Sequence, residues 1–197
     1  MNKILCVGII LVIAGCGNQT TKIKGDETTL GNKFSVSLMD DFEIIEYKII
    51  SDTLSIVSTS DFLYYPFNKY NDIKDLTNNY SFMENSVEYN DLHVPLYRFS
   101  FKKSYIKFVY DDQNRLFEIV AAKIFDDDIV LSNQIKIGIS KSDFISFFAD
   151  KIDFEEINNI NVIEFISGLT GIWHYYTFNN NVLVSYEIDT DYMLNKD

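Results

Sequence analysis

The chain has 197 residues, with 29 acidic and 17 basic side chains and a formal net charge of −12. Because such a surface repels phosphate backbones and anionic headgroups, we expect neither nucleic-acid binding nor electrostatic docking on lipid. Hydrophobic residues make up 47% of the chain and aromatic residues 15%. This is enough apolar material to pack one domain or two small fused units.

The first residues have the pattern of an export signal. Lys3 is followed by an apolar run from Ile4 to Ile13, then by the small residues Ala14 and Gly15, then by Cys16. The run is shorter than the roughly 20 residues that a membrane span needs. The pattern resembles a bacterial lipoprotein signal peptide, which implies cleavage before Cys16 and a diacylglycerol and palmitate anchor on that cysteine. The alternatives are an uncleaved anchor and a buried first strand.

Processing would divide the chain into a signal peptide at 1–15, a lipidated tether at 16–33 and a domain at 34–190. Cleavage removes one charged side chain, Lys3, so the net charge moves from −12 to −13. Cys6 leaves with the signal and lipid occupies Cys16, so no disulfide is expected. Gly17 follows the cysteine, and by resemblance to Gram-negative sorting this favours the outer membrane of the cell envelope.

Alternating runs at the start of the domain predict strands. They cover Phe34–Leu38, Phe42–Ile50, where a helix is not excluded, and the residues around Leu54 and Ile56. After Pro66, the segment Asn68–Tyr80 has helical spacing, with Asn68 as the expected N-cap. Its apolar face would consist of Ile73, Leu76 and Tyr80.

The middle of the chain predicts an antiparallel meander of about four strands over Val94–Ile137. Its turns are the polar clusters Asp111–Asn114 and Asp126–Asp128. A helix is then predicted over Ile139–Ile152, because Ser140 and Asp143 form a capping box. Its expected apolar stripe is Phe144, Phe147, Phe148 and Ile152.

The chain closes with a predicted hairpin of Ile172–Phe178 and Val182–Ile188, joined by an Asn-rich turn. Each predicted helix precedes an aromatic strand, a polar turn and an aliphatic strand. Aligning Asp72, Ile73 and Leu76 with Asp143, Phe144 and Phe147 suggests two αββ repeats, at about 66–125 and 137–190. The alternative is chance similarity in a sequence rich in Asn, Tyr and Phe. The expected fold is therefore α+β, with a mostly antiparallel sheet and two helices packed on one of its faces.

The segment from Ile135 to Phe144 resembles the helix entry of small outer-membrane lipoproteins of the SmpA/BamE kind. With the aromatic strand Ile172–Tyr176, it is also similar to the repeats of β-lactamase-inhibitor-like domains. The resemblance covers roughly residues 64–188. The Gly-x-Pro that usually follows the helix is replaced by Ala149-Asp150-Lys151. The resemblance implies only a periplasm-facing interaction module.

No catalytic motif stands out in the sequence. The two histidines, His93 and His174, lie in different elements, and without a mature thiol they supply no Cys/His zinc site. His174 is expected to be a half-buried sheet residue rather than a ligand or base, and His93 a loop residue. The Asp126–Asp128 cluster lacks the spacing and the Gly of a calcium loop, so turn chemistry accounts for it. We therefore expect no cofactor, no metal and no enzymatic activity.

Two groups of residues are candidates for binding a partner. Trp173 and Tyr175 alternate with His174 and Tyr176, so one of these pairs faces the core and the other is open. Asp126, Asp127 and Asp128 could steer a basic partner. The favoured function is a lipid-anchored, non-catalytic protein-interaction module. The alternatives are a glycan- or peptide-binding module and an acidic immunity or inhibitor lipoprotein.

Overall fold

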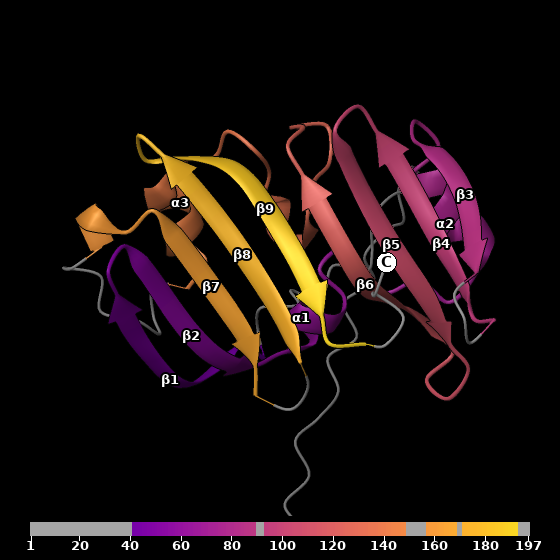
Figure 1. The fold of residues 1–197 in the computed structure, drawn as a ribbon, viewed down its shortest axis with the longest axis horizontal. Helices are drawn as coiled ribbons and strands as arrows, with labels where there is room; N and C mark the ends of the chain where they lie inside the picture. The colour runs from indigo at the N-terminus through magenta and orange to yellow at the C-terminus, as the bar shows by residue number, and fades with distance from the viewer. Residues whose placement is uncertain (1–40, 90–92, 149–156, 169–170, 193–197) are drawn as a thin grey trace, which may run out of the picture. The chain divides into compact units, whose positions relative to one another are not determined.

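The computed structural model describes residues 41–89, 93–148, 157–168 and 171–192, all within the second of the two units, 1–33 and 34–197, into which the chain divides. These residues form an α+β fold built on a nine-stranded, mostly antiparallel sheet (Figure 1). The predicted signal peptide 1–15, the tether 16–33 and the strand Phe34–Leu38 lie outside the described residues.

The sheet has the strand order β1-β2-β7-β8-β9-β6-β5-β4-β3. The strands are β1 Glu43–Ile50, β2 Thr53–Thr59, β3 Glu84–Tyr89, β4 Pro95–Phe101, β5 Ser104–Asp111, β6 Leu116–Ile124, β7 Val162–Ser167, β8 Ile172–Asn179 and β9 Val182–Thr190. The helices are α1 Asp61–Tyr64, α2 Ile73–Asn79 and α3 Lys141–Ser146, with 3₁₀ turns at Ser132–Gln134 and Ile157–Asn159. All strand pairs are antiparallel except β2 with β7.

The closing hairpin is confirmed as β8 and β9. Asn180 and Asn181 join the two strands with φ angles of 49° and 61°. Two consecutive residues with positive φ are typical of the tight turn whose twist matches that of a β-hairpin, and Asn tolerates this conformation well.

The meander is also present, but it begins and ends earlier than the sequence suggests. Its four strands are β3 to β6, so the first strand is Glu84–Tyr89, which lies before the predicted start at Val94. The predicted strand Ile129–Ile137 is wrong. The Leu131 amide donates to the Ile135 carbonyl oxygen at 2.8 Å, which closes a tight loop around the 3₁₀ turn. Apolar residues at alternate positions are buried there without a strand.

Helix α3 begins where the sequence predicts and ends sooner. The Asp143 amide donates to the Ser140 hydroxyl at 3.0 Å, and that hydroxyl donates to the Asp143 carboxylate at 2.7 Å. Phe144 and Phe148 are buried, whereas Phe147 is 36% exposed, so its predicted place within the apolar stripe is wrong.

The reason for this difference is the short-range geometry at the end of α3. The amides of Phe147 and Phe148 donate to carbonyls three residues earlier, at 3.3 and 2.8 Å. This tighter winding rotates the last side chains relative to an α-helix.

The other two helices begin at side-chain caps. Asp72 caps α2 by accepting from the Lys74 amide at 2.8 Å, in place of the predicted Asn68. Asn68 instead has a φ of 89°, which is not helical. Helix α1 was not predicted. It is one turn long and is capped by Ser60, whose hydroxyl accepts from the Phe62 amide at 3.1 Å. No helix in the described ranges is long and apolar enough to cross a membrane.

One large core joins the helices to alternate strand positions. Phe62 of α1, Leu76 of α2 and Phe144 of α3 belong to the same cluster of buried residues as Tyr176 of β8 and Tyr186 of β9. In the view of Figure 1 the three helices lie behind the strands. The intervening strand positions therefore belong to the other face of the sheet, which contains the candidate site.

Candidate functional site

Strand β8 divides its side chains between the two faces of the sheet, as its alternating pattern predicts. His174 and Tyr176 are fully buried in the core, whereas Trp173 and Tyr175 are half-buried on the opposite face. We call this second surface the Trp173 face. The alternation in the sequence predicts that Trp173 and Tyr175 share a face, and the structure brings them to the same side of the sheet.

A row of mainly polar side chains crosses the Trp173 face. Each member is the register partner of the next, one from every strand: Lys48, Ser55, Glu164, Tyr175, Glu187, Lys123, Tyr105, Ser100 and Glu84. Because directly opposite residues share a face, the row lies entirely on this side of the sheet.

Several members of the row hold one another in place. The Ser55 hydroxyl donates to Glu164 at 2.5 Å, and the Lys123 ammonium lies 2.6 Å from the Glu187 carboxylate. Burial, and next the negative charge of Glu164, raise the pKa of Tyr175 to about 12. Tyr175 therefore stays protonated at neutral pH and acts as a hydrogen-bond donor.

Beside this row lies an apolar patch formed by Ile45, Val57, Ile166 and Trp173. Val57, Ile166 and Trp173 are successive register partners on β2, β7 and β8. Ile45 of β1 is 57% exposed and lies over Gly168, where a Cβ would come 2.6 Å from the Ile45 Cδ1 atom. Asp189 is the register partner of Trp173 on β9, so the patch has a carboxylate at its border.

Both ring nitrogens of the buried His174 form hydrogen bonds within the core. The His174 Nε2 atom is 3.0 Å from the Leu63 carbonyl oxygen and so carries the proton, while Nδ1 accepts from the Tyr176 hydroxyl at 3.2 Å. Burial lowers the pKa of His174 to about 4, and the Leu63 hydrogen bond opposes this only in part. The imidazole is neutral at physiological pH and links α1 to β8.

The acidic turn Asp126–Asp128 forms more hydrogen bonds and ion pairs than its sequence suggests. Asp126 accepts from the Ser104 hydroxyl at 2.6 Å, and Lys102 lies 3.5 Å from Asp126 and 3.1 Å from Asp128. Asp127 is exposed. The structure therefore assigns Asp126 a role in holding the turn, and Lys102 partly neutralises the charge proposed for steering.

A half-buried carboxylate that the sequence did not single out, Glu118, lies near one end of the Trp173 face. Glu118 accepts from the Tyr192 hydroxyl at 3.3 Å and from the Tyr65 hydroxyl at 3.5 Å. Burial, and next the charge of Asp111, raise the pKa of Glu118. Tyr192 also packs on the small cluster of Leu96, Val109 and Val120. Glu118 thus anchors the segment after β9, and no sequence motif marks this contact.

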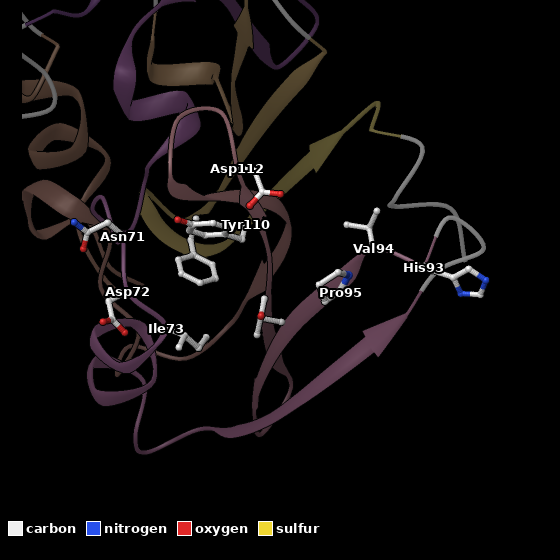
Figure 2. Close-up of a pocket in the computed structure, with 10 residues that line it drawn as sticks. Asn71, Asp72, Ile73, His93, Val94, Pro95, Tyr110 and Asp112 are labelled. Carbon is white, nitrogen blue, oxygen red and sulfur yellow. The ribbon is translucent and has the colours of Figure 1, made fainter.

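A pocket of about 540 Å³ opens between the start of α2 and strands β4 to β6. Its walls include Tyr97, Tyr110 and Phe117, with ring centroids 5.4 Å apart for Tyr97–Phe117 and 4.9 Å apart for Tyr110–Phe117. Figure 2 shows Asp72 at one side of the hollow and Asp112 near Tyr110. The pocket combines aromatic walls with carboxylates at its rim.

His93 is at the outer end of this pocket, and in Figure 2 its ring points away from the other lining residues. Its φ of 57° fits a loop residue, as predicted. Within the described ranges, no group of three or more His, Cys, Asp or Glu side chains could hold a metal ion. Comparisons with protein-family models, curated proteins and solved structures found no match for this chain.

Proposed function

We propose that this chain is a lipid-anchored protein of the cell envelope that acts without catalysis, by binding a protein partner on its Trp173 face. The observation that carries this proposal is the apolar patch around Trp173, set beside a row of charged and phenolic groups. Exposed apolar area with a polar surround is the usual chemistry of a protein interface. The net charge of −12 favours a basic partner.

The partner can be sought by co-purification from detergent-solubilised envelopes, followed by mass spectrometry. Trp173→Ala should abolish co-purification, because a half-buried Trp supplies much of the contact energy of such an interface. Tyr89→Ala is the matched control, since Tyr89 is 70% exposed on the far edge strand and outside the Trp173 face. Equal recovery of the same proteins with both variants would rule out this face as the interface.

The lipid anchor on Cys16 has its own test. Cys16→Ala removes the thiol that the lipoprotein resemblance makes the attachment point, so the variant should leave the detergent phase and the membrane fraction. Unchanged partitioning of Cys16→Ala would refute lipidation and leave the Trp173 proposal standing. Fractionation of the two membranes tests the outer-membrane assignment.

A second candidate function, glycan binding, is favoured by the pocket of Figure 2. Aromatic rings stack on sugar faces, while Asp72, Asp112 and Asn71 offer groups for hydroxyls. Tyr110→Ala should weaken binding of a matching saccharide in calorimetry, and Trp173→Ala should not. A saccharide whose binding is lost in Trp173→Ala and kept in Tyr110→Ala would contradict this placement.

We also propose that the helices cover only one face of the sheet and that the two halves of the domain are repeats. The two helix caps and two strand ends are related by the same sequence offset. Asp72, the cap of α2, lies as many residues before Ser140, the cap of α3, as Asp111, the last residue of β5, lies before Asn179, the last residue of β8. With this offset Leu76 aligns with Phe144. The alignment suggested by the sequence pairs Leu76 with Phe147, which is three residues further on. Amide hydrogen exchange should show similar protection in the meander β3–β6 and in the strands β7–β9. Protection confined to one of these two groups of strands would contradict the repeat.

A further inference from the structure

Strand β1 is an end of the sheet. It pairs with β2 along Glu43–Ile50, and in the described part of the chain no strand pairs with its other side. An unpaired strand edge presents a row of backbone donors and acceptors that can receive another strand.

The two ends of the sheet differ in composition. On β1, Ile45, Tyr47 and Ile50 are 57%, 51% and 59% exposed. On β3, Val87 and Tyr89 are likewise 48% and 70% exposed, but its charged residues, Glu84 and the half-buried Glu88, are both acidic. Like charges placed opposite one another disfavour strand pairing, whereas exposed apolar residues favour it. Strand β1 carries both signs of charge, so it is the end suited to pairing with a second copy.

The sequence of β1 is complementary to itself. Read in either direction from Tyr47, it gives one charged residue and then two isoleucines, Ile44–Ile45 on one side and Ile49–Ile50 on the other. The two charged residues are opposite in sign, Glu46 and Lys48. An antiparallel pair centred on Tyr47 would place each Glu46 opposite the Lys48 of the other strand, and this match occurs twice.

The faces of the strand agree with this pairing. Glu46 and Lys48 are register partners of Val57 and Ser55, which places both on the Trp173 face, while Tyr47 lies on the other. A two-fold axis perpendicular to the sheet keeps each face on the same side, so opposite charges meet directly. The bulge between Ile44 and Glu46 leaves Glu46–Ile50 regular.

We propose that β1 pairs with β1 of a second copy of this chain across a two-fold axis at Tyr47. The two sheets then become continuous, and the two apolar patches around Trp173 lie on the same side of the combined sheet. A partner bound on this face would meet a symmetric surface. The proposal depends on the β1 edge and not on the function suggested for the Trp173 face.

Disulfide trapping in the full chain tests the position of the axis. Tyr47→Cys puts a thiol opposite its own copy, at a separation that antiparallel neighbours and disulfides share. Mild oxidation of membranes should therefore yield much more linked dimer than Tyr89→Cys, the matched variant on the other edge strand. Cys6 and Cys16 are common to both variants and set the background. Equal dimer from the two variants would overturn the proposal.

Charge reversal in the Tyr47→Cys chain tests the register. Glu46→Lys alone and Lys48→Glu alone each put like charges opposite one another twice, so each should lower the linked dimer. Mixing the two variant chains restores both opposite-charge pairs and should recover the dimer as a heterodimer. Dimer that is indifferent to either reversal, or that does not recover on mixing, would exclude pairing centred on Tyr47.

Discussion

Acidification should destabilise this domain through His174. The imidazole is fully buried and neutral, with its pKa lowered from 6.5 to about 4 by burial. The unfolded chain takes up a proton near pH 6.5, whereas the folded chain resists it until about pH 4. The contribution is thus fully present above pH 6.5 and is lost as the pH falls towards 4. At about 1.4 kcal/mol per pKa unit, the loss is about 3 kcal/mol.

Urea unfolding at a series of pH values measures this effect when the wild type is compared with His174→Gln, which has no titrating imidazole. The carboxylates are common to both proteins, so their titration cancels in the difference. The free-energy difference between the two proteins should shift by about 3 kcal/mol against the wild type between pH 7 and pH 4. A difference that is constant over this range would refute the buried neutral imidazole.

Three further substitutions test the packing at α3. Phe144→Ala should cost about 3–5 kcal/mol of stability in chemical denaturation, because Phe144 is fully buried beside Tyr176 and Phe178. Phe147→Ala should cost below about 1 kcal/mol, because Phe147 is partly exposed. Equal losses would contradict the winding at the end of α3 that separates these two side chains. Lys141→Met should cost about 1–3 kcal/mol, because the buried ammonium donates to the carbonyls at residues 157, 158 and 160 at 3.1, 3.4 and 2.8 Å. Unchanged stability of Lys141→Met would show that water replaces these bonds.

Features set by a few adjacent residues were predictable from the sequence. The opposite orientations of Trp173 and His174 follow from the two-residue period of a strand. Asn180 and Asn181 mark the last hairpin because few other residues accept two positive φ angles. Ser140 marks the start of α3 because its hydroxyl satisfies a free amide.

Features that depend on distant residues were not predictable. Ile129 and Leu131 alternate like strand residues, yet they are buried in the core from a segment that forms no strand and leads into the 3₁₀ turn Ser132–Gln134. The pocket and the Glu118 contacts join segments far apart in the chain, and no local pattern encodes their approach. The row across the Trp173 face requires the register of all nine strands, which appears only when the sheet order is known.

The parallel pairing of β2 with β7 has a consequence for the order of folding. Thr53 pairs with Val162 and Ser58 with Ser167, so the first hairpin joins the sheet through a strand from the last quarter of the chain. Contacts between residues so far apart form slowly, because the intervening chain must first lose its freedom. During synthesis or export from the N-terminus, β1 and β2 emerge early and can pair only with each other. Their docking on the rest of the sheet waits until β7 emerges, so the strands made first join the sheet only after most of the chain has been made.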